Sequence, residues 1–383
     1  MGVVTPRVNV RRRRSTWIVL TVLVVAIGGV PTSRSGASSS AITVPLPLRH
    51  DQPGLAVRAG ESSSIYVLWR QSDSCSQCWS LTRSTYDLQS IVKVTAPPKI
   101  RYVAGDPTGS LVSLVFSTVS DGMALEQLTT GSDALYVTHN GAHSWTRWPL
   151  PAGAQLMDLV AAPTGFFATE RTCQAKPWRC VDTSLLRAEQ GATRWSATPI
   201  PGARSLHGEI VDVGAWRHHV WLTGSTPAPP YAFLATSTDG GRSFSMGHEG
   251  DLMSIVSCSL IAMSERSLWA TCLGGHAYTL LHSSDAGSQW QTVSTPVPNM
   301  AQGSGFAPVS ATTSYVSLAL TKRLYVITRG GKAVTLRGPS PSPYLVGLVF
   351  VGAKDGLAIG QKGSAFRVTV TSDGGRHWTR IQS

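Results

Sequence analysis

Charged residues are scarce in this chain. Asp, Glu, Lys and Arg make up 14% of its 383 residues, while hydrophobic residues make up 42%. So few charges argue against a long helical or coiled-coil protein, and the ample apolar fraction argues against a disordered chain. The same composition argues against a polytopic membrane protein. The chain is therefore predicted to be globular.

Cysteine is absent before residue 75, which excludes a lipid-modified cysteine near the N-terminus. The six cysteines that follow form three near-neighbour pairs, as is typical of exported proteins. The spacing Cys75-Ser76-Gln77-Cys78 is also that of a redox or metal motif, but a zinc site would need a second such pair, so no metal is expected. We expect local disulfides, namely Cys75–Cys78, Cys173–Cys180 and Cys258–Cys272.

Acidic residues are absent from residues 1–37, which contain six arginines. The rest of the chain has 27 basic and 21 acidic residues, so the formal net charge falls from +12 to +6 without this segment. No basic run occurs in the rest of the chain. A nucleic-acid partner is not expected. The segment has a positive start, the apolar stretch Trp17–Val30 and the small residues Ser35-Gly36-Ala37, which is the layout of a secretory signal peptide.

The apolar stretch contains 14 residues, fewer than the roughly 20 that span a bilayer. We therefore expect residues 1–37 to be a cleaved signal peptide, with an uncleaved membrane anchor as the alternative, and residues 38–52 to be a linker. The protein is predicted to be exported, either secreted or extracytoplasmic and tethered by that segment.

Turn and strand residues are abundant. The chain has 37 Gly, 23 Pro and 12 Trp, with many Ser, Thr and Val, and this favours short strands joined by tight turns. One box recurs, with Ser or Thr, then Asp, Gly and an aromatic residue in a fixed frame. It reads STDGGRSF at 237–244, SSDAGSQW at 283–290 and TSDGGRHW at 371–378. Degenerate copies end at Trp145, Trp195, Val334 and Ile91.

The interval between successive boxes is roughly 40 to 50 residues, the length of one propeller blade. A second element repeats in phase: Asp121-Gly122 and Asp355-Gly356 each form a predicted turn between two strands. The last unit reads as strands near 345–351, 357–360, 366–371 and 379–381. Residues 53–383 are thus predicted to be all-β, a single β-propeller of about seven four-stranded antiparallel blades, with six or eight as alternatives.

The boxes resemble the BNR or Asp-box repeat of sialidase-like propellers, and the last unit is most similar to the photosystem II stability and assembly factor type. The resemblance implies that the boxes are structural and lie away from the active face. Family members that assist photosystem assembly are thought to bind protein partners through the opposite face. A photosynthetic role for this chain has no support in the sequence beyond that resemblance.

Each box also has a physical reason to be structural. A carboxylate in the turn can accept backbone N–H bonds, glycine supplies positive φ, and we expect the aromatic residue to pack between the outer strands of its own blade. The structural box residues are Asp239, Gly241, Phe244, Asp285, Gly287, Trp290, Asp373, Gly375 and Trp378.

The face opposite the boxes is the predicted binding surface. It comprises the links between blades, predicted at 199–212, 245–253, 296–310 and 337–344, and the loops between second and third strands. Trp178, on a loop closed by Cys173 and Cys180, is either an outward anchor for a partner or buried against its own blade. The binding-face candidates are Arg171, Lys176, Trp178, Arg179, Arg204, His207, His248 and Arg337.

Catalysis has weaker candidates on the same face. Glycoside hydrolysis usually needs two carboxylates, and Glu209, Glu249 and Asp251 are the available ones, although they also read as solvated loop residues. A metal site built from His207, His248 and Asp251 lacks a preorganised ligand pair. The Arg-Ile-Pro motif of true sialidases does not occur in residues 38–91. No cofactor is expected.

The sequence therefore predicts an exported, non-enzymatic propeller that binds a protein or membrane-protein partner and is itself a monomer. The alternative is a glycoside hydrolase or a glycan-binding protein of the sialidase-like superfamily.

Overall fold

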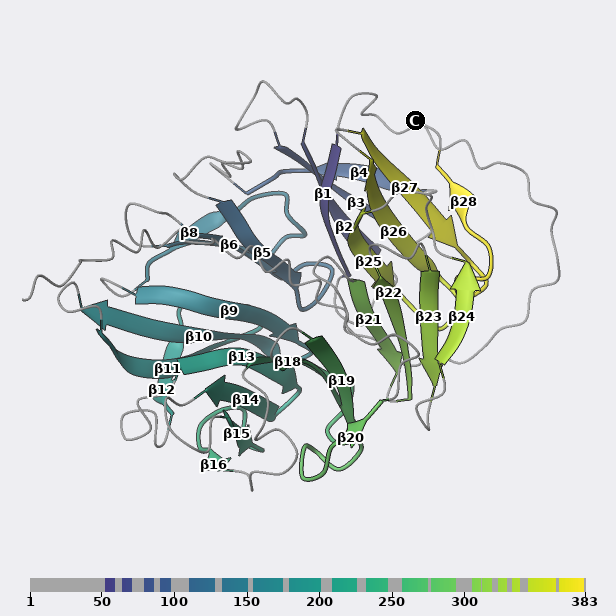
Figure 1. Ribbon diagram of the computed structural model, residues 1–383. Helices are drawn as coiled ribbons and strands as arrows, with labels where there is room; N and C mark the ends of the chain where they lie inside the picture. Colours follow the sequence, from purple (N-terminus) through teal and green to yellow (C-terminus); the bar gives the residue numbers. More distant parts are fainter. Residues whose placement is uncertain are drawn as a thin grey trace, which may run out of the picture.

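A computed structural model shows an all-β chain of 28 strands arranged as seven sheets (Figure 1). The residues that it describes are 52–58, 64–70, 79–85, 90–97, 110–127, 133–150, 154–174, 179–200, 209–225, 232–246, 257–274, 277–293, 305–310, 312–318, 323–328, 333–337, 344–362 and 365–381. Within them, no helix is long and apolar enough to cross a membrane.

Each sheet consists of four consecutive antiparallel strands. Blade 1 contains β1 (Gln52–Arg58), β2 (Ser64–Arg70), β3 (Trp79–Thr85) and β4 (Ile91–Val94). Blade 2 contains β5 (Ser110–Phe116), β6 (Gly122–Gln127), β7 (Ala134–Thr138) and β8 (Thr146–Trp148). Blade 3 contains β9 (Ala154–Ala162), β10 (Gly165–Gln174), β11 (Arg179–Glu189) and β12 (Ser196–Pro199).

The other four blades repeat this order. Blade 4 contains β13 (Glu209–Trp216), β14 (His219–Ser225), β15 (Ala232–Ser237) and β16 (Ser245–Met246). Blade 5 contains β17 (Ser257–Ala262), β18 (Leu268–Gly274), β19 (Ala277–Ser283) and β20 (Gln291–Thr292). Blade 6 contains β21 (Gly305–Ser310), β22 (Thr313–Leu318), β23 (Arg323–Thr328) and β24 (Ala333–Arg337). Blade 7 contains β25 (Tyr344–Phe350), β26 (Gly356–Lys362), β27 (Ala365–Thr371) and β28 (Thr379–Arg380).

The first strands of the blades line the centre of the molecule. Neighbouring first strands contact one another from β25 through β1, β5, β9 and β13 to β17, and β21 contacts β25. Each sheet runs from its first strand outward to its fourth. The predicted seven-bladed propeller is thereby confirmed, and the six- and eight-bladed alternatives are wrong.

The hydrophobic clusters of the described residues lie between neighbouring blades, namely 1 and 2, 2 and 3, 3 and 4, 4 and 5, and 7 and 1. Along β14, Val220 and Leu222 pack in the cluster shared with blade 3, while Trp221 between them packs in the cluster shared with blade 5. Alternation along a strand sends successive side chains to opposite faces. A blade strand is consequently apolar at successive positions rather than at every second one.

The predicted limits of two links are wrong. Residues 209–212 belong to β13, and residues 305–310 form β21. Both first strands contain a register shift, between Ile210 and Asp212 and between Pro308 and Ser310. A bulge accommodates an unpaired residue or a proline inside a sheet. Segments whose polar residues and prolines predict a link can therefore form strands.

Candidate functional site

The turns that contain the recurring boxes connect the third and fourth strands and lie on one face of the ring. In blade 4, the Ser237 hydroxyl donates to Asp239 Oδ1 (2.7 Å) and accepts the Gly241 N–H (2.8 Å). The N–H groups of Arg242 and Ser243 donate to Asp239 Oδ1 at 2.9 and 3.0 Å. The carboxylate thus accepts bonds from within its own turn, as an Asx turn does.

The same network recurs in blades 5 and 7, around Asp285 and Asp373. Gln289 N–H donates to Asp285 Oδ1 (2.9 Å), and His377 N–H donates to Asp373 Oδ1 (2.9 Å). In blade 2, Asn140 stands in the place of the aspartate, and its Oδ1 accepts the Ser144 N–H (2.9 Å). An uncharged amide oxygen therefore supports the same turn.

Each box is fastened to the turn between the first two strands of its own blade. Box N–H groups donate to a carbonyl of that turn in four blades. These bonds run from Gly141 to Ser120 (2.8 Å), from Gly240 to His218 (2.7 Å), from Ala286 to Arg266 (2.8 Å) and from Gly374 to Lys354 (2.8 Å). The backbone polar groups of this face are thus engaged within the fold.

Hydrogen bonding shifts the pKa values of two box carboxyls. Bonds from the Ser243 hydroxyl, the Ser243 N–H and the Ser237 hydroxyl hold the pKa of Asp239 well below its ordinary value. For Asp373, burial raises the pKa, but bonds from His377 and Thr371 outweigh it and the net shift is downward. His377 Nδ1 lies 2.6 Å from Asp373 Oδ2. Both carboxyls are therefore structural anions rather than proton donors.

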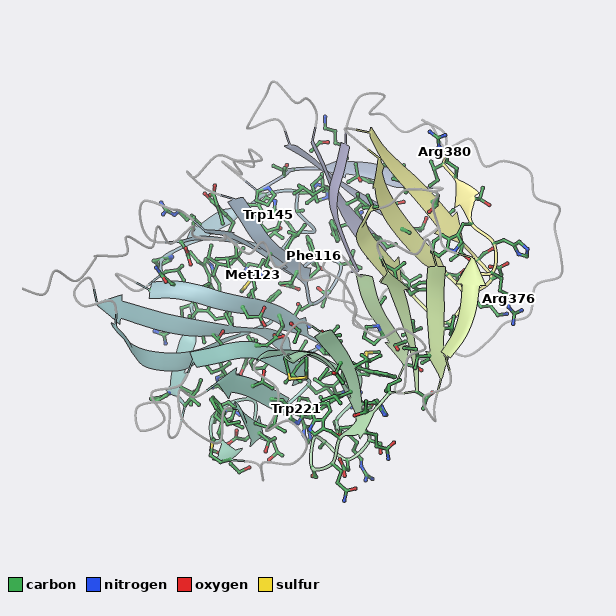
Figure 2. The ribbon with its side chains drawn as sticks, viewed as in Figure 1. Phe116, Met123, Trp145, Trp221, Arg376 and Arg380 are labelled. Atoms are coloured by element: carbon green, nitrogen blue, oxygen red, sulfur yellow. A yellow bond between two sulfur atoms is a disulfide. The ribbon has the colours of Figure 1, made fainter. Side chains whose placement is uncertain are left out.

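The aromatic residue at the end of a box packs against the preceding blade. Trp290 of blade 5 lies in a cluster with Trp216 and Leu234 of blade 4, and Phe244 of blade 4 packs against the cluster shared with blade 3. Trp145 of blade 2, which is labelled in Figure 2, donates from Nε1 to Thr95 O of blade 1 (2.8 Å). The expected packing between outer strands of one blade is thus wrong for these residues.

The predicted binding-face residues lie mostly outside the described residues, namely Lys176, Trp178, Arg204, His207, His248, Glu249 and Asp251, as do Cys75 and Cys78 and the whole of 1–51. Arg171 lies on β10 and Arg179 on β11. Arg337 ends β24, so it is a strand residue and not a link residue, and Glu209 begins β13 rather than lying in the preceding link. Their placement together in one site stays a prediction.

The cysteine pattern is confirmed in blade 5. Cys258 of β17 and Cys272 of β18 are cross-strand partners joined by a disulfide, and both side chains are buried. In blade 3, Cys173 and Cys180 are also cross-strand partners in the register of β10 and β11. They stand at the end of that hairpin, next to residues 175–178.

The hairpin of β10 and β11 is the longest in the ring. β10 has 10 residues and β11 has 11, whereas the corresponding β14 and β15 have 7 and 6. Both second strands begin after two-residue turns, so β10 extends three residues further from the box face than β14 does. At about 3.3 Å per residue, this carries the end of β10 roughly 10 Å beyond the end of β14. Figure 1 shows β10 and β11 reaching the edge of the molecule.

The connections from one blade to the next are longer in sequence. β4 ends at Val94 and β5 begins at Ser110, and β20 ends at Thr292 before β21 begins at Gly305. The turns of the box face are shorter, such as that between β13, ending at Trp216, and β14, beginning at His219. Loops between blades are where propellers vary while the strands are retained.

Two acidic residues near the centre were missed by the sequence reading. Asp158 of β9 and Asp212 of β13 lie at equivalent positions of successive blades, each opposite a threonine of its own second strand. Asp212 is 5% exposed. A signal was present, because each aspartate interrupts an apolar strand, in LMDLV and in IVDVG.

These carboxyls do not have the arrangement of a glycosidase pair. Both accept the N–H of Val213, at 3.1 Å for Asp158 Oδ2 and 2.8 Å for Asp212 Oδ1, so the two groups are adjacent. Glycosidase carboxyls instead stand about 5 Å or more apart, on either side of a substrate. Nor do the described residues contain a group of three His, Cys, Asp or Glu that could hold a metal ion.

The comparisons with known proteins agree with the fold. No family model and no curated protein matches the chain. A solved prolyl endopeptidase is 12% identical with a TM-score of 0.56; the match covers 87% of this chain and 50% of that one, so the chain spans half its length. The β-propeller domain of the Trilobed protease from Pyrococcus furiosus is 8% identical with a TM-score of 0.53, over 87% and 98% of the two chains.

A third structure, YCF48 from Cyanidioschyzon merolae, is 16% identical with a TM-score of 0.49, over 68% of this chain and 81% of that one. Identities at this level show the fold alone. The protein is a seven-bladed β-propeller.

Proposed function

We propose that this chain is an exported Asp-box propeller that binds a protein or membrane-protein partner through the face opposite its boxes. The observation that carries the proposal is the extended hairpin of β10 and β11. Its strand β10 extends roughly 10 Å beyond the equivalent strand β14 of blade 4, and Cys173 stands opposite Cys180 near its end. A disulfide between Cys173 and Cys180, which the sequence predicts, would brace the hairpin next to Trp178 and Arg179.

The chemistry of that segment suits a protein partner. The segment Lys176-Pro177-Trp178-Arg179 combines an aromatic residue with two basic ones, and Trp and Arg are enriched among the residues that dominate binding energy. The box face is less suited to this role, because its turn carbonyls and box carboxylates are engaged in bonds within their own blades. The partner surface is therefore assigned to the opposite face.

The test uses the full chain as bait in an envelope extract. The variant Trp178→Ala with Arg179→Ala is compared with a matched control, Arg376→Ala with Arg380→Ala. The control removes two exposed arginines that point outward from blade 7 in Figure 2. We expect one protein to be captured by the wild type and by the control, and lost in the hairpin variant.

Loss of capture in the control as well would contradict a site on the hairpin. Capture unchanged in the hairpin variant would do the same. Hydrolysis of fluorogenic glycosides by the wild-type chain would replace the binding proposal by the hydrolase alternative. Export is tested separately by N-terminal sequencing of protein recovered outside the cytoplasm, where a new terminus shortly after Ala37 is expected.

A further inference from the structure

The first strands of blades 3, 4 and 5 are joined by two carboxyl side chains, those of the half-buried Asp158 and the buried Asp212. Asp158 Oδ2 of blade 3 accepts the Val213 N–H of blade 4 (3.1 Å), and Asp212 Oδ2 of blade 4 accepts the Leu260 N–H of blade 5 (2.8 Å). Their other oxygens accept the N–H of the residue that follows, Leu159 and Val213, each at 2.8 Å. Each aspartate thus reaches from its own blade to the next.

The two carboxyls meet at one donor. Val213 N–H is shared between Asp158 Oδ2 and Asp212 Oδ1, so the two carboxyl groups lie side by side, and hydrogen bonding with Asp158 is one of the causes that raise the pKa of Asp212. A hydrogen bond between two carboxyl groups requires a proton on one of them, since an ionised carboxylate is an acceptor only. Two ionised carboxylates that accept the same N–H would lie close together and repel each other.

A second observation points to the same place. Thr169 of β10 lies opposite Asp158 in the register and is fully buried, and its hydroxyl has no hydrogen-bond partner. Its equivalent in blade 4, Thr223, donates to Cys258 O of the next blade (3.1 Å). Cross-strand partners face the same side of a sheet, so the Thr169 hydroxyl points toward the seam with blade 4, where the carboxyl pair lies.

The other charged groups of these blades do not neutralise the pair. Glu170 of β10 alternates with Thr169 and faces blade 2, and Asp133, whose Oδ2 accepts the Leu156 N–H (2.8 Å), also lies on that side. On β17 the facing residue is Ser259, which hydrogen-bonds to Asp212. The described side chains that face the pair from β10, β13 and β17 therefore add hydroxyls and no cation.

We propose that Asp158 and Asp212 form a proton-binding site at the centre of the propeller, in which one shared proton clamps blades 3, 4 and 5 together. The occupant is a proton rather than a metal cation, because three backbone N–H groups point their positive ends at the carboxyl oxygens. Cation sites of this kind are lined by oxygen ligands instead.

The direction of the pKa supports the clamp. Burial, and then the charge of Asp158, raise the pKa of Asp212 well above its ordinary value, against the opposing bonds from Ser259 and the Leu260 N–H. The folded chain therefore keeps a proton that the unfolded chain releases near pH 4. The stability due to this proton is complete below that pH, and it is lost as the pH rises through the raised pKa of Asp212 in the folded chain.

Asp212→Asn is the decisive variant. An amide nitrogen in the place of Oδ1 would donate to Asp158 Oδ2 as the shared proton does, and the amide oxygen in the place of Oδ2 would still accept the Leu260 N–H. Val213 N–H would retain Asp158 as its acceptor. The amide NH2 would face the Val213 N–H, which Oδ1 accepts in the wild type. We therefore expect a loss of stability that does not depend on pH, in a clamp that holds no titrating proton.

The melting temperatures of the full chain and of Asp212→Asn are measured from pH 5 to pH 9. We expect the wild-type Tm to fall with rising pH. The total fall should be about 2 °C for each factor of ten by which the folded chain binds this proton more tightly than the unfolded chain does. The variant should lack that part of the fall. Infrared difference spectra of the wild type between pH 6 and pH 9 should show loss of a protonated-carboxyl band that is absent from the variant's spectra.

Equal pH dependence of Tm in the two proteins would overturn the proposal. So would a wild-type infrared difference spectrum without a protonated-carboxyl band, a measurement that does not depend on the variant folding. A rise in wild-type Tm with added Ca²⁺ or Mg²⁺ at pH 8, lost in Asp212→Asn, would assign the site to a cation instead of a proton.

Discussion

At the scale of single residues, the box glycines illustrate how strongly local geometry depends on the neighbouring blade. Gly241 has a φ of +78°, and a Cβ at that position would overlap Leu185 of blade 3, which is fully buried. Ala142 occupies the equivalent position in blade 2 with a φ of 65°. The positive φ alone therefore does not exclude a methyl group at this position. Whether a Cβ fits depends on the packing of the adjacent blade.

This comparison gives the first prediction. Gly241→Ala is expected to lower the free energy of unfolding by about 2–4 kcal/mol, from the backbone strain and the overlap with Leu185 together. Gly191→Ala is the matched control, because Gly191 has a φ of +70° with nothing within 4 Å of its Cβ position. It should lose only about 1 kcal/mol. Equal losses in urea unfolding would show that overlap with Leu185 contributes nothing.

The box carboxyls predict a dependence of stability on acid. The pKa values of Asp239 and Asp373 are lowered in the folded chain, so the stability they contribute is present above their ordinary pKa near 4 and lost as the pH falls below it. Asp239→Asn should fold at neutral pH, as Asn140 does in blade 2, and should show a smaller fall in Tm between pH 5 and pH 2. A steeper fall in the variant would be inconsistent with this account.

At the scale of elements, the recurring boxes and Asp-Gly turns were sufficient to predict four strands per blade and seven blades. The strands of the last unit lie within a residue or two of the predicted limits. The packing of Phe244 and Trp290 against the preceding blade was not predicted, because period-two alternation assigns a residue to a face but does not say which blade covers that face.

The central carboxyl pair escaped prediction for a related reason. Asp158 and Asp212 are isolated acids within apolar strands, and their meaning depends on the approach of two first strands that are distant in sequence. The binding-face residues were chosen from loops, where sequence gives composition but no geometry. Their grouping therefore remains a prediction, while the strands that carry Arg171, Arg179, Glu209 and Arg337 are established.

Hydrogen bonds between blades give a prediction at this scale. Trp221 Nε1 of blade 4 donates to Ala286 O of blade 5 (2.9 Å), whereas the buried Trp290 Nε1 in the same cluster has no partner. Trp221→Phe should cost about 1 kcal/mol more than Trp290→Phe, since only the first substitution leaves a carbonyl without its donor. Chemical unfolding of the two variants measures the difference. An equal cost would assign no net stability to the bond.

At the scale of the whole molecule, the described strands close the ring without exchange between the chain ends. Blade 1 is built from β1–β4 and blade 7 from β25–β28, and neither sheet contains a strand from the other end. The seam is held by apolar packing, with Ile65 and Val67 of blade 1 against Val349, Leu357 and Ile359 of blade 7. Other neighbouring blades are also joined by the chain itself, so this seam depends on packing more than they do.

Opening of the ring is therefore expected to begin between blades 7 and 1. Ile359→Ala, at a fully buried seam position, should lower stability by about 2–5 kcal/mol. Leu222→Ala is the control, because Leu222 is equally buried between blades 3 and 4, which the chain connects directly. Hydrogen exchange should accelerate more in β1 and β25 of Ile359→Ala than in β9 and β13, because the substitution removes part of the apolar packing that opposes local opening of that seam. The control should show no such preference for β1 and β25. Uniform acceleration over all blades in Ile359→Ala would mean that the seam opens only when the whole ring opens. Packing between blades 7 and 1 would then resist opening as strongly as a seam whose two blades are connected by the chain.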